Sequence, residues 1–206
     1  GFQSQIERRT VQGELEAAVS QISGKERVVI YGSGRTDAGV HALGQVFAFD
    51  MEWRHTEHEL LRAINSGLPA DIVVRTLSLV SVEFDPRRSA RWRSYQYRIY
   101  NAEVRSPLQM RRSWHVKIEL DLDAMRSGAK YLVGKYDFAS FGKSPDKVGH
   151  TVRNVRRLEW RSNNNILIMD IEANAFLYRM VRSIVGTLYM VGVGSWKSSV
   201  VEEVLY

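Results

Sequence analysis

The rest of this chain is predicted to be organised around the stretch Gly32-Ser-Gly-Arg-Thr-Asp-Ala-Gly-Val-His41. An apolar run at residues 27–31 leads into it, and a second run at residues 45–49 follows it. Glycine lets a backbone bend sharply or approach a ligand closely, so the stretch is predicted to be a loop between two strands. Such a loop would hold Arg35 and Asp37 rigidly, as a catalytic site requires, although a purely structural connection could carry the same residues.

Apolar periodicity predicts helices and strands in both halves of the chain. The predicted helices cover residues 11–23, 57–66, 122–133, 176–193 and 200–206. Further strands are predicted at residues 72–82, 94–101, 114–120, 152–161 and 166–173, and a loop at residues 135–149. Thr10 is the predicted N-cap of the first helix, and Thr56 with Glu59, like Ser199 with Glu202, has the spacing of a capping box.

This order of elements favours an α+β fold, with a mostly antiparallel sheet and helices packed on it. A weak boundary at Ser106-Pro107 divides the chain in two. Residues 1–105 are the predicted N-terminal catalytic lobe, which carries the loop, and residues 106–206 are the predicted C-terminal lobe. Because the two halves have similar content, we expect two similar lobes around a central cleft.

The composition of the 206 residues is that of an ordinary globular protein, with 44% hydrophobic and 25% charged residues. Cysteine is absent, which excludes disulfides, thiolate nucleophiles and zinc sites built on cysteine. No apolar run approaches the roughly 20 residues that span a bilayer. No charged and then apolar leader is visible at the N-terminus, so we expect a cytoplasmic protein without a membrane partner.

The charge balance is basic, with 29 Lys and Arg against 23 Asp and Glu, and arginine supplies most of the positive charge. Arginine binds phosphate bidentately and stacks on bases. One cluster contains Arg87, Arg88, Arg91, Arg93, Arg98, Arg105, Arg111 and Arg112, with Trp92, Tyr95, Tyr97 and Tyr100 interleaved. A second contains Arg153, Arg156, Arg157 and Arg161. A single arginine is more often just solvated, but the clusters together favour looped or single-stranded RNA as the partner.

Asp37 is the carboxylate in the loop whose role matters most, and several roles are open. It could cap the loop backbone, or act as a nucleophile, a base or a metal ligand. The loop is neither a phosphate loop nor a dinucleotide fingerprint, and no second carboxylate lies nearby in the sequence. His41 could pair with Asp37. Arg179 and Arg182 interrupt the apolar helix at residues 176–193, and a buried arginine there would need a carboxylate such as Asp37.

These residues carry a resemblance to a known family. Gly34-Arg-Thr-Asp-Ala-Gly-Val-His-Ala42, followed by Gly44-Gln-Val46, resembles the catalytic motif of the tRNA pseudouridine synthase A family (the TruA type). Other stretches resemble the family in the expected order: Gly1-Phe-Gln, Thr10-Val-Gln12, Phe84-Asp85, Arg88-Ser-Ala90, Tyr95-Gln-Tyr97, Tyr136-Asp-Phe138 and Ala173-Asn-Ala-Phe-Leu-Tyr-Arg-Met-Val-Arg182. The resemblance therefore spans essentially the whole chain.

The resemblance implies two α+β lobes around a continuous antiparallel sheet with an RNA-binding cleft. It implies isomerisation of uridine to pseudouridine in the anticodon stem-loop of tRNA, at positions 38, 39 and 40, by a homodimer that uses no metal and no cofactor. Asp37 matches the catalytic aspartate, Tyr95 the tyrosine that stacks on the target base, and Arg182 the basic partner of the aspartate. The residues assigned to RNA binding are Arg35, Thr36, His41, Arg88, Arg91, Arg93, Phe176 and Arg179.

The chain departs from the family at both ends, because the family's first strand and its C-terminal segment are missing. We therefore expect a shortened member of the family. A non-catalytic RNA-binding module is the first alternative, and a metal-dependent phosphodiesterase that uses Asp37 and histidines is the second. Whether Asp37 acts as nucleophile or as the base that starts glycal formation stays open.

Overall fold

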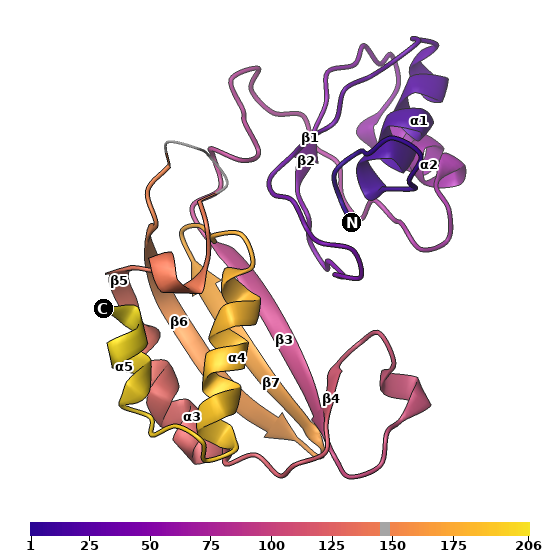
Figure 1. Ribbon diagram of the computed structural model, residues 1–206. Coiled ribbons are helices and arrows are strands. Elements are labelled where there is room, and N and C mark those ends of the chain that lie inside the picture. The colour runs from indigo at the N-terminus through magenta and orange to yellow at the C-terminus, as the bar shows by residue number, and fades with distance from the viewer. Residues whose placement is uncertain (145–148) are drawn as a thin grey trace. The chain divides into compact units, whose positions relative to one another are not determined.

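The computed structural model describes residues 1–144 and 149–206. The chain forms two compact units, Gly1–Ala90 and Arg91–Tyr206, which are described one after the other (Figure 1). The boundary between the two units falls after Ala90, fifteen residues before the predicted boundary at residue 105. The reason is that β3 (Arg93–Asn101) pairs with β7 (Ile166–Ala173) and is thereby part of the second unit.

The first unit contains two helices and a short antiparallel ladder. Its elements are α1 (Val11–Ser23), β1 (Tyr31–Gly32), β2 (Phe47–Ala48) and α2 (Glu57–Gly67). The predicted helix starts are confirmed: the Thr10 hydroxyl accepts a hydrogen bond from the N–H of Gly13, and Thr56 and Glu59 form a capping box. Buried apolar side chains from both helices and from the segments around them form one core, which consists of Phe2, Leu15, Val19, Val28, Ile30, Leu60, Ile64 and Val74.

The strand predicted at residues 72–82 is wrong, because no residue in that range belongs to a strand. The side chain of Asn65, on α2, makes the hydrogen bonds to the Val74 backbone that a neighbouring strand would otherwise make. The Asn65 side chain accepts from the N–H of Val74 and donates to its carbonyl, both at 2.8 Å. The segment is therefore held by side-chain contacts, including one from the N–H of Leu79 to the Glu57 carboxylate, without belonging to a sheet.

The second unit contains a five-stranded sheet in the order β4-β3-β7-β6-β5. Its other strands are β4 (Trp114–Val116), β5 (Gly134–Asp137) and β6 (Val152–Asn163). Every pairing is antiparallel except that of β3 with β4, so the prediction of an α+β fold with a mostly antiparallel sheet is confirmed. The helices α3 (Leu122–Ala129), α4 (Met180–Gly192) and α5 (Val200–Leu205) cover one face of the sheet (Figure 1).

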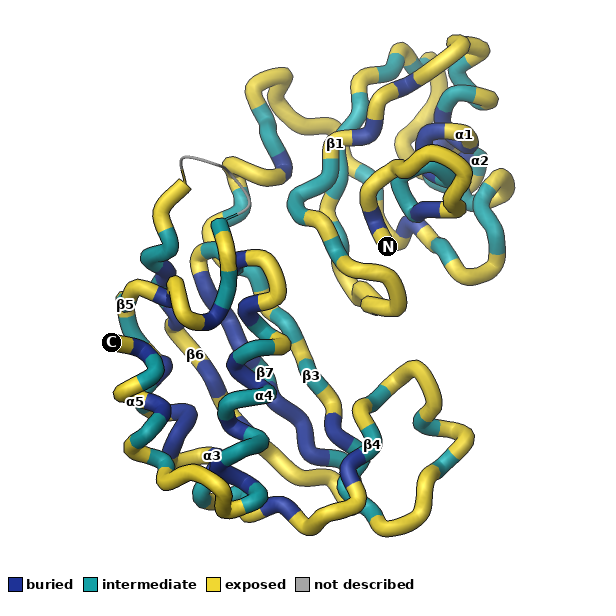
Figure 2. Tube along the Cα trace, in the orientation of Figure 1, coloured by how far each residue is buried: buried dark blue, intermediate teal, exposed yellow. Residues whose placement is uncertain are grey.

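The core of the second unit lies between that face and the helices. Met169 and Ile171 of β7 and Ile184 and Leu188 of α4 are fully buried there, and β7 runs through the most buried part of the unit (Figure 2). Alternate residues of β3 point to this core, as the sequence pattern predicted, and Tyr95 and Tyr97 pack against it.

Three local predictions for this unit need correction. The loop predicted at residues 135–149 contains most of β5 and a 3₁₀ turn at Ala139–Phe141, and residues 145–148 lie outside the described residues. The helix predicted from residue 176 begins at Met180. The capping box at Ser199 is absent, because Ser199 itself has helical backbone angles and its side chain caps nothing.

The face of the sheet away from the helices carries a ladder of polar contacts. Asp170 accepts hydrogen bonds from Gln96 at 2.9 Å and from Arg161 at 3.0 Å. Burial raises the pKa of the Asp170 carboxyl, but the hydrogen bonds from Gln96 and Arg161 and the charges of Arg161 and Arg157 outweigh it. The pKa therefore lies below its usual value.

A carboxyl whose pKa is lowered on folding stabilises the protein above its unfolded pKa of about 3.9, and this contribution is lost as pH falls. We expect Asp170→Asn to lower the free energy of unfolding at pH 7 by about 1–2 kcal/mol, because a charge-assisted contact becomes neutral. The difference from the parent should shrink at pH 3, as measured by urea unfolding at both pH values. A difference of equal size at both would contradict this account. Asp123→Asn, at an exposed surface pair with Arg126, is the control.

Candidate functional site

The loop that carries Asp37 is closed at its base by contacts between its two ends. The N–H of Ser33 donates to the carbonyl of Val46 at 2.9 Å, and the Gln45 amide donates to the carbonyl of Gly34 at 2.8 Å. Asp37 opens a tight turn in which its carbonyl accepts from the N–H of Val40 at 3.2 Å. The third residue of this turn is Gly39, whose φ of 80° is in the region that favours glycine.

The N-terminal segment supports the same loop from the side. The N–H of Phe2 donates to the carbonyl of Thr36 at 3.2 Å. The Phe2 ring is buried against Gly32, where a side chain would lie 2.3 Å from the ring carbon Cε1. Gly32 is therefore required by close packing. Reasoning from the sequence missed this role of Phe2, and only the Gly1-Phe-Gln stretch of the resemblance pointed to it.

The predicted loop residues lie together on the first unit. Arg35, Asp37 and His41 are exposed, and Thr36 is half-buried. The loop is also held near its end by Arg75, whose guanidinium donates to the carbonyl of Leu43 at 3.1 Å. The loop thus presents a carboxylate, a guanidinium and an imidazole on a backbone held at several points, which suits nucleophilic or acid–base chemistry.

A second set of predicted residues lies on the helix-covered face of the second unit. The rings of Tyr95 and Phe176 meet edge to face, with centroids 4.9 Å apart. Tyr97 lies next along this face of β3. Burial raises the pKa of Tyr97, and the positive charge of Arg182, in the first turn of α4, opposes that rise. The set therefore combines aromatic rings with a cation that acts electrostatically on Tyr97.

The chain that leads into α4 is extended, which explains why the helix begins late. The N–H of Tyr178 donates to the carbonyl of Lys143 at 2.9 Å. A side chain at Gly142 would lie 2.6 Å from the carbonyl oxygen of Tyr178, so the two segments touch through their backbones. Arg179 has a left-handed φ of 63° and places its guanidinium 5.1 Å from the Tyr178 ring centroid.

Arg179 and Arg182 are both exposed, which corrects the expectation that they are buried within an apolar helix. Arg179 directly precedes α4, and Arg182 lies in the first turn of this helix. Because neither arginine is buried, burial does not require a carboxylate partner for them, contrary to what the sequence suggested.

The remaining predicted RNA-binding arginines are spread along residues 88–93. Arg88 pairs with Asp85 at 3.7 Å, Arg91 is exposed, and Arg93 donates to the carbonyl of Asn174 at 2.8 Å. The two units each hold one set of predicted site residues, with Arg88 at the end of the first unit and Arg91 at the start of the second.

The arginines of the second basic cluster, at residues 153–161, contact their own chain more than the sequence indicated. Arg153 is buried and donates to the carbonyls of His150 and Val152. Arg156 pairs with Glu172, and Arg161 pairs with Asp170. Three of the four arginines therefore contact their own chain, as Arg88 and Arg93 of the first cluster also do.

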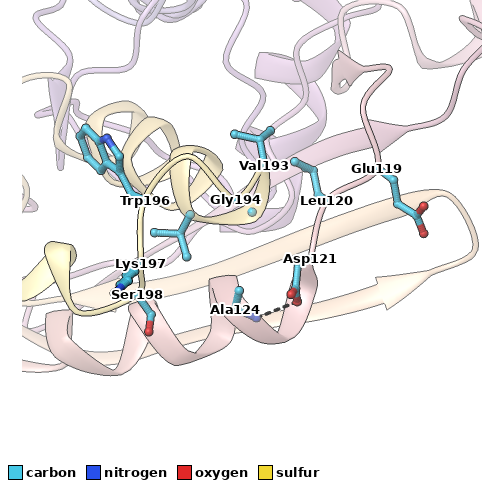
Figure 3. Close-up of a pocket in the computed structure, with 11 residues that line it drawn as sticks. Glu119, Leu120, Asp121, Ala124, Val193, Gly194, Trp196, Lys197 and Ser198 are labelled. Carbon is cyan, nitrogen blue, oxygen red and sulfur yellow. Dashed lines mark hydrogen bonds between the residues drawn. The ribbon is translucent and has the colours of Figure 1, made fainter.

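Figure 3 shows a pocket of about 580 Å³ at the other end of α4, lined by residues such as Asp121, Val193, Trp196 and Lys197. About ten helical residues, or roughly 15 Å, separate its α4 residues from Arg182. This pocket is thus distinct from the candidate residues. Within residues 1–144 and 149–206, no three His, Asp or Glu side chains form a set that could hold a metal ion. No helix in the described part of the chain is long and apolar enough to cross a membrane.

Comparison with known proteins finds a family model and several relatives that match the chain. The family model described as tRNA pseudouridine synthase matches residues 1–87 and 129–206. The chain is 41% identical over 206 residues to tRNA pseudouridine synthase A of Pseudothermotoga lettingae, covering all of this chain and 84% of the relative. It is 39% identical to the enzyme of the same name from Bacillus licheniformis, covering all of this chain and 83% of the relative. It is 40% identical over 197 residues to the one from Caldicellulosiruptor saccharolyticus, covering 96% of this chain and 80% of the relative.

Proposed function

The chain belongs to the tRNA pseudouridine synthase A family, and we propose that it converts uridine to pseudouridine at positions 38, 39 and 40 of the tRNA anticodon stem-loop. The observation that carries the proposal is the loop around Asp37. Its carboxylate is exposed on a backbone held by Phe2, Gln45 and the β1–β2 ladder, within the stretch that resembles the family's catalytic motif.

The proposed reaction needs one carboxylate and no outside reagent. The N1–C1′ bond of uridine breaks, the uracil turns, and a C5–C1′ bond forms. The proton on C5 is lost and N1 gains a proton, so substrate and product have the same composition and no cofactor is required. Asp37 acts either as the nucleophile at C1′ or as the base that starts glycal formation.

Aromatic and basic residues on the second unit have the chemistry that an extruded nucleotide needs. Taking a base out of its stack costs a few kcal/mol, and stacking on an aromatic ring returns about 1–3 kcal/mol. We assign the stacking role to Tyr95, whose ring is held edge to face by Phe176. We assign Arg182 to catalysis, as the cation that stabilises negative charge during bond cleavage. Binding of the RNA is assigned to the residues Arg35, Thr36, His41, Arg88, Arg91, Arg93 and Arg179.

The direct test is incubation of the chain with an unmodified tRNA transcript that has uridine at positions 38–40. We expect pseudouridine at those positions by mass spectrometry of nuclease digests, and equal yield when a divalent-metal chelator is present. A transcript with cytidine at the three positions is the control and should give no product. Binding without product would favour a non-catalytic RNA-binding module, and strand cleavage that stops in chelator would favour a metal-dependent phosphodiesterase.

The resemblance also predicts a homodimer, a two-lobed cleft for RNA and a cytoplasmic location. These three statements remain predictions for this chain.

A further inference from the structure

We propose that Gln12, on the first turn of α1, is a positioning residue that holds the segment leading into the loop that carries Asp37 and the N-terminal segment that contacts this loop. The inference rests on the proposed function for its catalytic consequence. Its structural part, that Gln12 immobilises the loop, stands on contacts within the first unit alone.

The side-chain amide of Gln12 joins three parts of the first unit. Its Oε1 accepts from the backbone N–H of Ser4 at 3.0 Å. Its Nε2 donates to the carbonyl of Ile30 at 3.1 Å and to Oε1 of Glu16 at 2.9 Å. Both amide hydrogens and the amide oxygen are therefore used. Asparagine and glutamine are the side chains that offer two donors and an acceptor at once, and glutamine has the greater reach.

Glu16, one turn further along α1, completes the hold on Ile30. Its side chain is 11% exposed and its Oε1 accepts from the N–H of Ile30 in a long contact of 3.5 Å. Its Oε2 pairs with Arg27 at 3.2 Å. Both backbone polar groups of Ile30 are thus bonded to side chains of a helix. Because Ile30 directly precedes β1, these contacts anchor the strand that leads into the loop.

A second line of contacts runs from the backbone of the same helix turn. The N–H groups at the start of a helix have no partner within the helix. Here the N–H of Gln12 donates to the carbonyl of Phe2 at 2.9 Å, and the N–H of Val11 donates to that of Gly1 at 3.2 Å. Phe2 in turn donates to the carbonyl of Thr36, the residue directly before Asp37. The start of α1 is therefore connected to the loop through Ile30 and through Phe2.

The consequence for catalysis follows from the geometric tolerance of a reacting carboxylate. A displacement of about 1 Å, even by a change remote from the chemistry, can cost about a hundredfold in rate. Loss of the Gln12 amide would leave the carbonyl of Ile30 and the N–H of Ser4 without this partner and would loosen the connection through Ile30, while the backbone contact with Phe2 remains. It would leave unchanged Arg88, Arg91, Arg93 and Arg179, which we assign to RNA binding, and Tyr95, which we assign to stacking, because none of them lies on this loop.

The test compares Gln12→Met with Gln21→Met, which changes the same residue type at an exposed position of the same helix. We expect Gln12→Met to lower kcat for pseudouridine formation at least tenfold, with KM for tRNA changed by less than about threefold. We also expect faster amide hydrogen exchange at residues 30–38 of the free protein, and no change in either quantity for Gln21→Met.

Unchanged exchange at residues 30–38 in Gln12→Met would overturn the inference whether or not the parent modifies tRNA. An inactive parent would overturn only the proposed function. Unchanged kcat with faster exchange would overturn the catalytic part of the inference. A fall in kcat with an equal rise in KM would do the same, because it would indicate general damage.

A second pair of variants covers the case in which Gln12→Met does not fold. Gln12→Glu keeps the size and the acceptor for Ser4, but it loses both donors and places a second carboxylate beside Glu16. The double variant Gln12→Glu/Glu16→Gln removes that repulsion, while position 12 still offers no donor to the carbonyl of Ile30. We expect the double variant to regain thermal stability but to keep the low kcat. Full recovery of kcat would contradict a positioning role for the Gln12 amide.

Discussion

Asp37→Asn is expected to abolish pseudouridine formation while tRNA binding stays intact. The substitution keeps the size and shape of the side chain, so the hydrogen bond from the N–H of Val40 to the carbonyl of Asp37 should form as before. It removes the negative charge and the basic oxygen that either proposed mechanism requires. We expect kcat to fall by at least about 10³-fold, as is common when an essential catalytic group is removed.

Single-turnover assays and filter binding with the same tRNA transcript would measure the two effects separately. Asp50→Asn is the matched control, because Asp50 is also an exposed carboxylate of the first unit and lies just after β2. It should retain full activity. Pseudouridine formation by Asp37→Asn at a rate near that of the parent would refute the assignment of Asp37.

Arg182→Met should have the second largest effect, with kcat lowered about 10²- to 10³-fold. Arg182 is exposed in the first turn of α4, and its charge already acts on Tyr97. Methionine keeps the unbranched stem and removes the charge, so the loss reports on the electrostatic role. Arg182→Lys keeps a point charge without the planar fork, and we expect an intermediate rate.

Arg98→Met is the control for this pair of variants, because Arg98 is also exposed but lies on the face of β3 opposite to Tyr97. Its removal should affect tRNA binding weakly and kcat not at all. If Arg182→Met raised only KM, Arg182 would bind RNA without a part in the chemistry. If Arg98→Met lowered kcat as much as Arg182→Met, the effect would follow net charge rather than position.

Elements that depend on near neighbours in the sequence were predictable. Thr10 caps α1, and Gly24 ends it with a left-handed φ of 66°. Thr56 and Glu59 form their box because the partners lie three residues apart in one turn. The same spacing failed at Ser199, where the backbone had already become helical and left no orphan N–H group for the side chain.

Elements that depend on distant partners were not predictable from local pattern. Residues 72–82 alternate like a strand, but Asn65 takes the polar groups of Val74 and no strand forms. The apolar run from residue 176 is typical of a helix. Contact with Lys143 and the close approach of Gly142 keep its first residues extended and delay α4 to Met180.

The sequence by itself determined the family of this chain, its candidate carboxylate and its class of fold. The motif around Asp37, the helix caps and the alternation of apolar and polar residues in the strands all involve residues that lie close together in the sequence. Only the tertiary structure decided how the loop is held, which arginines form hydrogen bonds or ion pairs within their own chain, and which aromatic rings are in contact. Gln12 and Ile30 lie eighteen residues apart, and Tyr95 and Phe176 come from different elements. Such contacts depend on how helices and strands pack, and packing brings together residues whose separation no local pattern encodes.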